Sequence, residues 1–363
     1  MCTRVLFKSK ANESYVGRNM DWAENPTPQL WAMPANVKRK AVAKTKRGQE
    51  FRWKSKYSSI IVSNFDIATS DGLNSEGLTA NLLWLSTSVY PSVPHHEDAY
   101  PLSMSIWTQY ILDMCRSVKE AIYAMKNIYI QTTVIPDSGD KLATCHLSVG
   151  DKKGNSAVFE YIDGRLHIFT NVDTSGKKFK DYPHYIKHYD LDQMAVMTND
   201  PNFNTQVASL IYWDELNEKY KKEGAPAILP GSNWSLSRFI RATYFKRELL
   251  SDVKKTYALA QLSAVINNAA QPPTAADALD LSRTQYSSFA DQARLQYFFR
   301  SAYGPFLIWI NLREINFDNL KKGYAFKLSL NQDGVFEGCN GYGSGNLNTY
   351  LKEEKMFAFL PIE

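Results

Sequence analysis

The chain begins Met1-Cys2-Thr3-Arg4, and a second informative segment, Gly17-Arg18-Asn19-Met20-Asp21-Trp22, follows shortly after it. The first segment leads into an apolar, strand-like run. Polar residues at 10–14 then form a turn, after which residues 15–22 return as a second β-rich run. Two β-rich runs joined by a polar turn predict a hairpin, which would place the second segment beside Cys2.

Cys2 becomes the N-terminal residue once Met1 is removed, and a small residue at position 2 favours that removal. It then carries a thiol and an α-amine together. A thiol of pKa near 8.5 is mostly protonated at neutral pH, and an amine of pKa about 7.7–8 can accept its proton. Arg18 would favour the thiolate, and Asp21 could accept a hydrogen bond from the amine.

The alternative is a small buried cysteine at a strand start, with Arg18 and Asp21 as a surface ion pair. Side chains three residues apart on a strand point to opposite faces, so both reach Cys2 only if the strand bends or bulges.

Composition is that of an ordinary globular protein. The 363 residues are 44% hydrophobic and 13% aromatic, enough to form a large core. The net charge of +5 comes with mixed signs and no recognisable nucleic-acid module, so we expect no nucleic-acid partner. No 18-residue apolar run occurs, which predicts no membrane span.

Neither metal nor cofactor is expected. The four cysteines are Cys2, Cys115, Cys145 and Cys339. They are widely spaced and form no CxxC pair, which excludes zinc knuckles. His184 and His188 have the spacing of two ligands on a helix, but no HExxH motif supports them. Cys145 and His146 are adjacent on a strand, point to opposite faces and cannot form a dyad.

The compartment follows from the start of the chain. Residues 1–7 lack the basic segment, apolar stretch and cleavage site of a secretory signal. We expect a cytoplasmic protein if Met1 is native, and a periplasmic one if a signal peptide preceded Cys2.

Strand and helix patterns alternate in blocks. Strands are expected at residues 3–9, 15–22, 57–64, 78–85, 142–149, 157–162, 166–171, 194–198, 286–289, 295–300, 306–312 and 324–330. Helical periodicity covers about 104–111, 118–125, 204–221 and 236–268, the last with Ser235 or Ser237 as candidate cap. This order predicts an α+β layered fold, with residues 1–363 as a single domain.

The motifs resemble the choloylglycine hydrolase and penicillin V acylase family, which are N-terminal nucleophile hydrolases of the cysteine type. Beyond the first two segments, the resemblance continues at residues 71–78 (DGLNSEGL), 196–203 (VMTNDPNF) and 237–241 (SRFIR). These motifs occur in the family's order. The resemblance implies a four-layer αββα sandwich.

The resemblance also implies catalytic roles. Cys2 attacks the amide carbonyl, and its α-amine acts as base and then protonates the leaving amine. Arg18 and Asp21 hold and tune that pair, and Arg238 adds positive charge nearby. Water finally cleaves the acyl-enzyme.

An oxyanion hole is implied at Asn199, through its side-chain amide, together with the backbone N–H of Trp84. Each such donor typically contributes about 3–4 kcal/mol to the transition state. Trp84 stands where Gram-positive members usually carry Asn or Tyr, so the sequence looks closer to the Gram-negative branch. Trp22 and Trp84 would form an aromatic wall for the acyl group; the alternative is two core aromatics.

The implied function is hydrolysis of a linear amide C–N bond in a small-molecule N-acyl amide. Penicillin V and N-acyl homoserine lactones are favoured by the branch features, with conjugated bile salts as the alternative. A non-catalytic small-molecule-binding paralogue is the alternative of another class. The resemblance also implies a homo-oligomer, the homotetramer of the family. The stretch between Asn199 and Arg238, which usually holds the hairpin used in tetramer assembly, is short here and argues against that assembly.

Overall fold

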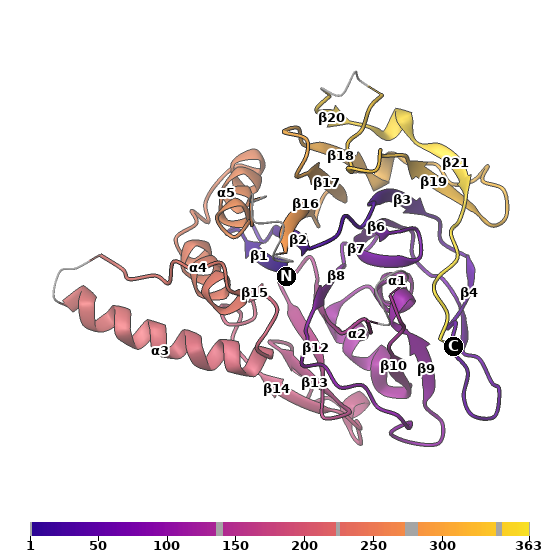
Figure 1. The fold of residues 1–363 in the computed structure, drawn as a ribbon, viewed down its shortest axis with the longest axis horizontal. Coiled ribbons are helices and arrows are strands. Elements are labelled where there is room, and N and C mark those ends of the chain that lie inside the picture. The colour runs from indigo at the N-terminus through magenta and orange to yellow at the C-terminus, as the bar shows by residue number, and fades with distance from the viewer. Residues whose placement is uncertain (1, 136–140, 223–225, 273–281, 339–342, 363) are drawn as a thin grey trace.

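Two β-sheets stack face to face, and helices cover the outer face of each (Figure 1). The computed structural model describes residues 2–135, 141–222, 226–272, 282–338 and 343–362. Helices α4 and α5 pack on β1 and β2 of the first sheet, and α1 and α2 pack on β7, β8, β11 and β12 of the second. The predicted αββα sandwich is therefore confirmed.

The first sheet has the order β15-β1-β2-β16-β17-β18-β20. Its strands are β1 (Cys2–Lys8), β2 (Ser14–Trp22), β15 (Val196–Met197), β16 (Arg283–Asp291), β17 (Gln296–Ser301), β18 (Ile308–Asn311) and β20 (Gly345–Asn346).

The second sheet has the order β14-β13-β12-β11-β8-β7-β6-β3-β19-β21. Its strands are β3 (Gln29–Met33), β6 (Ser59–Asn64), β7 (Ala68–Asn74), β8 (Thr79–Trp84), β11 (Cys145–Gly150), β12 (Ser156–Ile162), β13 (Arg165–Thr170), β14 (Tyr185–His188), β19 (Tyr324–Leu328) and β21 (Lys352–Lys355). Two small sheets pair β4 (Lys38–Lys40) with β5 (Arg52–Lys54), and β9 (Tyr100–Ser103) with β10 (Ile128–Gln131).

The helices complete the layers. The α-helices are α1 (Met104–Met114), α2 (Val118–Ala124), α3 (Phe203–Lys222), α4 (Ser235–Arg247) and α5 (Lys255–Asn268). Short 3₁₀ turns are η1 (Met125–Asn127), η2 (Lys177–Phe179), η4 (Leu312–Glu314) and η5 (Asn348–Tyr350). Among the described residues, no helix is both long and apolar enough to cross a membrane.

The predicted first hairpin is present, and its register fixes which side chains meet. Cys2 pairs with Met20, and Arg4 pairs with Arg18. These four side chains point toward the second sheet, where Arg4 contacts Ser156 on β12 at 3.1 Å. The helix-facing side of β2 needs Gly17, because a Cβ there would lie 2.7 Å from Ile266 Cγ1 on α5.

Several sequence predictions were wrong in detail. The single helical stretch at 236–268 is two helices separated by residues 248–254. Trp234 is the N-cap residue of α4, and Ser235 instead uses its hydroxyl to accept from the backbone N–H of Asn199 at 2.7 Å. His184 lies just before strand β14 and His188 lies in it, so the two histidines are not on a helix.

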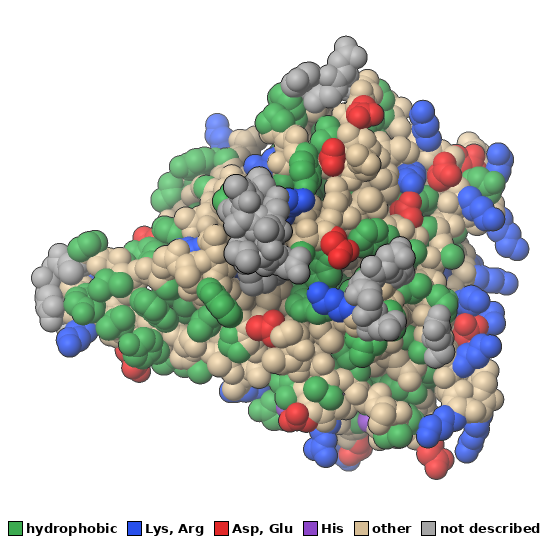
Figure 2. All heavy atoms as spheres, in the orientation of Figure 1, with side chains coloured by type: hydrophobic (Ala, Val, Ile, Leu, Met, Phe, Trp, Pro, Cys, Tyr) green, Lys and Arg blue, Asp and Glu red, His purple; other side chains and the backbone are tan. Residues whose placement is uncertain are grey.

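Surface charge is mixed in sign. On the face in Figure 2, basic and acidic side chains are interspersed, and apolar side chains lie along α3. Two of these, Ile211 and Tyr212, are 48% and 61% exposed.

Three histidines gather around the carbonyls of η1. The His184 Nε2 lies 3.0 Å from Met125 O, and the His95 Nε2 lies 2.9 Å from Lys126 O. The ring of His95 stands 4.4 Å from those of both His96 and His184. Burial, followed by the charge of His95, lowers the pKa of His184 to about 4. The cluster is therefore stable in its neutral form.

We predict that this cluster makes stability fall in acid. A histidine whose pKa is about 4 when folded and about 6.5 when unfolded binds its proton preferentially in the unfolded state, so stability is lost as pH falls from about 6.5 to 4. The loss from His184 amounts to about 2–3 kcal/mol. His184→Gln, which can still donate to Met125 O, should reduce that loss in urea unfolding curves between pH 7 and pH 4. His188→Gln, at an exposed position of β14, is the matched control; equal curves for His184→Gln and wild type would contradict the prediction.

Candidate active site

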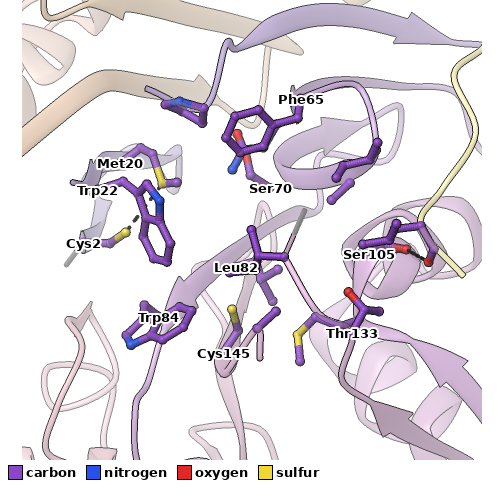
Figure 3. Close-up of a pocket in the computed structure, with 18 residues that line it drawn as sticks. Cys2, Met20, Trp22, Phe65, Ser70, Leu82, Trp84, Ser105, Thr133 and Cys145 are labelled. Carbon is purple, nitrogen blue, oxygen red and sulfur yellow. Dashed lines mark hydrogen bonds between the residues drawn. The ribbon is translucent and has the colours of Figure 1, made fainter. Parts of the chain in front are cut away.

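Cys2 lines an apolar cavity whose walls come from both sheets, from the start of α1 and from neighbouring loops (Figure 3). Its Sγ lies 3.7 Å from Met20 Sδ, 3.8 Å from Arg18 Nη2 and 3.9 Å from the backbone oxygen of Asp21. The cavity encloses about 820 Å³, including its open mouth. Its lining comprises Cys2, Met20, Trp22, Pro26, Asn64, Phe65, Ile67, Ala68, Ser70, Leu82, Trp84, Met104, Ser105, Thr133, Ile135, Ala143, Cys145 and Leu360. None of these described lining residues is an acid, a base or a histidine.

Arg18 approaches the thiol from the space between the sheets. Its Nη2 donates to Leu82 O at 2.8 Å, and its Nη1 donates to Tyr286 OH at 2.8 Å and to the Asp71 carboxylate. Burial alone would lower the pKa of Arg18, but its interactions with Tyr286, Asp71 and Cys2 raise it well above its usual value. Arg18 is therefore a permanent positive charge beside Cys2.

Asp21 lies on the opposite face of β2, toward the helices. Its carboxylate accepts from Thr284 Oγ1 at 2.6 Å, from Gln271 Nε2 at 3.3 Å and from Arg238 Nη1 at 3.1 Å. The same Nη1 of Arg238 donates to Cys2 O at 2.8 Å. Arg18 and Asp21 thus meet Cys2 from opposite sides, Arg18 at the thiol and Asp21 through Arg238 at the backbone.

The expected bulge or bend in β2 was wrong, because Arg18 and Asp21 act on Cys2 from opposite faces; a bulge lies instead in the partner strand β16. Asp21 pairs with Thr284 and Met20 with Tyr286, which leaves Gln285 as an extra residue in β16. A bulge re-aims the side chains on either side of it. Thr284 can therefore contact Asp21 on the helix side while Tyr286 contacts Arg18 between the sheets.

Asn199 follows β15 and lies between Cys2 and β8. Its Oδ1 accepts from the nitrogen of Cys2, which is the α-amine in the processed chain, and from Arg238 Nη2 at 3.0 Å. Its Nδ2 donates to Trp84 O at 2.6 Å. These contacts fix the amide orientation, because oxygen faces two donors and nitrogen faces an acceptor.

The backbone of Trp84 points toward Cys2. Leu85 N bonds to Thr144 O, so the next pair along, Trp84 with Cys145, is a non-hydrogen-bonded pair of the ladder. The N–H and C=O of one strand residue share an edge. Since Trp84 O faces Asn199, Trp84 N–H also faces the Cys2 side.

Two tryptophans flank Cys2 in the cavity (Figure 3). The rings of Trp22 and Trp84 meet edge to face, with centroids 4.9 Å apart. Lys141 Nζ lies 5.2 Å and 5.0 Å from the centroids of these two rings, within cation–π distance. Both side chains line the cavity and are half-buried, and Trp22 also packs against the hydrophobic core.

Cys145 is the other thiol of the cavity. Burial, followed by the charge of Cys2, raises the pKa of Cys145 to about 12. His146, the next residue, points away and places its Nδ1 2.7 Å from Glu160 Oε1. The prediction that Cys145 and His146 form no dyad is confirmed.

Sequence reasoning missed several partners of the site. Asp71 was noted within the DGLN motif without a role, and it is the ion-pair partner of Arg18. Tyr286 lay in the predicted strand 286–289, and Thr284 lay just before it. A strand pattern does not indicate which residue adjoins a bulge.

Comparisons with known proteins agree with this geometry. The family model described as linear amide C–N hydrolases, choloylglycine hydrolase family, matches residues 2–193 and 183–323. The penicillin V acylase of Pectobacterium atrosepticum is 34% identical over 99% of this chain and 92% of its own. The bile salt hydrolase/transferase of Clostridium perfringens is 24% identical over 91% of this chain and 98% of its own. The solved structure of penicillin V acylase from Agrobacterium tumefaciens superposes with a TM-score of 0.79 at 31% identity, covering 99% of this chain and all of that one.

We predict that iodoacetamide modifies Cys2 and spares Cys145. At pH 8 a thiol of pKa about 12 is ionised in roughly one molecule in 10⁴, and the thiolate is the reactive form. Peptide mapping after alkylation should show Cys2 modified at least about 100-fold faster, and Cys2→Ala should remove that modification. Mapping also separates Cys339, which lies outside the described residues. Comparable rates at Cys2 and Cys145 would contradict the prediction.

Proposed function

This chain belongs to the choloylglycine hydrolase family of linear amide C–N hydrolases, and on that premise we propose that Cys2 is the nucleophile with which it cleaves an N-acyl amide. The observation that carries the proposal is the placement of Cys2, whose thiol opens onto the cavity and whose nitrogen is held by Asn199 Oδ1. Thiol and amine on one residue form a nucleophile with its own base.

The reaction proceeds in two halves. The α-amine of Cys2 takes the thiol proton, the thiolate attacks the amide carbonyl, and the C=O electron pair moves to oxygen. The resulting ammonium gives its proton to the departing nitrogen as the C–N bond breaks, which leaves a thioester on Cys2. A water molecule then adds to the thioester while the amine accepts its proton, and the acid leaves as the thiol re-forms.

Two donors can receive the oxyanion. Asn199 Nδ2 carries two hydrogens, of which Trp84 O takes one, and Trp84 N–H faces the same side. Donors fixed before the reaction stabilise charge that develops only in the transition state. We assign the oxyanion hole to these two groups.

The charged residues have separate tasks. We assign Arg18 to stabilising the thiolate, because its Nη2 lies 3.8 Å from Cys2 Sγ. We assign Asp21 to holding Arg238, because Arg238 in turn anchors both Cys2 O and Asn199 Oδ1. Burial lowers the pKa of Arg238, while the charges of Asp21 and Cys2 oppose that effect.

The cavity favours an uncharged, apolar acyl group. Its described lining offers no charged side chain to pair with an acid or a base on that group. The edge-to-face pair of Trp22 and Trp84 suits a flat aromatic ring or an alkyl chain. We therefore propose a penicillin V or N-acyl homoserine lactone acylase. The identities of 34% to a penicillin V acylase and 24% to a bile salt hydrolase support that order.

The first test removes the nucleophile. Purified wild-type protein should lack Met1 by intact mass, and Cys2→Ala should lose hydrolysis of every amide that the wild type cleaves while keeping its unfolding midpoint. Cys2→Ser should retain a small fraction of activity, because an amine deprotonates a hydroxyl poorly. Full turnover by Cys2→Ala would end the proposed mechanism. An intact fold with no hydrolysis in the wild type itself would favour the non-catalytic paralogue.

The second test concerns the acyl group. Wild type should show higher kcat/KM on penicillin V or a long-chain N-acyl homoserine lactone than on glycocholate. Trp84→Ala should lower the first two values about tenfold, because an aromatic wall contributes on the order of 1 kcal/mol beyond burial. Trp213→Ala, on α3 and outside the cavity lining, is the matched control. A tenfold preference of wild type for glycocholate would reverse the substrate assignment and leave the amide chemistry in place.

A further inference from the structure

The guanidinium of Arg18, which lies beside the Cys2 thiol, also contacts the buried carboxylate of Asp71. Asp71 and Arg18 are 0% and 1% exposed, and Asp71 Oδ2 accepts from Arg18 Nη1. Tyr297 OH donates to Asp71 Oδ1, and Tyr286 OH and Ser288 Oγ each lie 3.4 Å from Asp71 Oδ2. Asp71, which projects from β7 of the second sheet, is therefore held by groups of the first sheet.

Arg18 is shared between two negative partners. One terminal nitrogen, Nη1, meets Asp71, and the other, Nη2, lies 3.8 Å from Cys2 Sγ. All three groups are buried, and charges in a low-dielectric interior interact strongly over such distances. The carboxylate of Asp71 thus offsets part of the field that Arg18 exerts on Cys2.

Holding Arg18 in place does not require a charge at position 71. Leu82 O and Tyr286 OH already accept from its two terminal nitrogens at 2.8 Å each. A neutral acceptor would complete the same geometry. Meanwhile Arg238 adds a second buried guanidinium at Cys2, bonded to its carbonyl oxygen at 2.8 Å. The charge of Asp71 compensates the buried guanidinium, and through that guanidinium it also acts on Cys2.

The effect on Cys2 concerns its nucleophilicity. A thiolate that is stabilised too strongly attacks more slowly, and the best attacking thiol ionises near the ambient pH. We propose that Asp71 is a positioning residue whose charge sets how strongly Arg18 stabilises the Cys2 thiolate, and so keeps that thiolate reactive. This inference rests on the proposed function only in taking Cys2 as the nucleophile.

The test is the pH dependence of Cys2 alkylation, which needs no substrate. In Asp71→Asn the amide oxygen can still accept from Arg18, and its nitrogen can donate to Tyr297, so the change is mainly one of charge. The alkylation midpoint should move about one pH unit lower, because one compensating charge several ångströms away is lost. Turnover should fall about threefold, because thiolate nucleophilicity falls by roughly that factor for each unit of thiol pKa. KM should stay within about twofold, because the acyl cavity is untouched.

The matched control is Asp113→Asn. Asp113 is also buried and pairs with an arginine, Arg39, at 2.8 Å, but it lies on α1 and accepts from Trp53 Nε1, away from Cys2. Its loss should leave the alkylation profile where it is in wild type. An equal shift in this control, or no shift in a folded Asp71→Asn, would overturn the proposal.

A second variant covers the case in which Asp71→Asn fails to fold. Tyr297→Phe removes a donor from Asp71 Oδ1 and leaves its bond to Arg18, so the carboxylate should offset Arg18 more fully. The alkylation midpoint should then move up by a few tenths of a pH unit, opposite in sign to Asp71→Asn. An unmoved or lowered midpoint would overturn the proposal. Failure of the proposed function is distinguishable, because it would appear as turnover by Cys2→Ala whatever the alkylation profiles show.

Discussion

The buried guanidinium of Arg18 is the constraint on which the rest of this site depends. It projects from β2 of the first sheet and bonds to β7 and β8 of the second, through Asp71 and Leu82 O. Removing one partner of a buried ion pair typically costs about 3–5 kcal/mol, because the other charge is left without compensation. The same contacts that join the sheets therefore fix the charge beside Cys2, and stability and reactivity depend on one side chain.

The cavity exists because β8 separates from β7 at this point. Their pairing runs from Leu73 with Thr79 to Asp71 with Asn81 and then stops. Beyond it, the carbonyls of Leu82 and Trp84 lie on an edge that no strand of the described residues covers, and they accept from Arg18 and Asn199 instead. Backbone groups that would otherwise complete a ladder thus become the anchors of the site. The opening of the sheet and the polar contacts at Cys2 have the same structural cause.

The layered fold and the first hairpin could be predicted from the sequence, because period-2 runs and polar turns are local signals. The motifs also named the residues, from Cys2 to Arg238, that the structure brings together. The bulges could not be predicted. In β7 the register with β6 shifts so that Ser70 is an extra residue, and Ser70 and Asp71 both face Tyr286 as a result. Strict alternation would send these neighbours to opposite faces. The helix break after α4 was likewise missed, because residues 248–254 keep apolar spacing that resembles a continuing helix.

The two thiols of the cavity show that the reactivity of a cysteine depends on where it lies in the fold. Cys2 and Cys145 both line the same apolar space, and both are candidates by composition. Cys145 sits on the side where the lining is apolar, and burial raises its pKa to about 12. Cys2 sits at the boundary between that lining and the polar layer between the sheets, with Arg18 Nη2 at 3.8 Å. An apolar wall on one side excludes water and strengthens every charge interaction, while the polar layer on the other supplies those charges. A nucleophile needs both the apolar wall and the polar layer. Within the described residues of this cavity, the two meet at the start of β1, where Cys2 also supplies its α-amine.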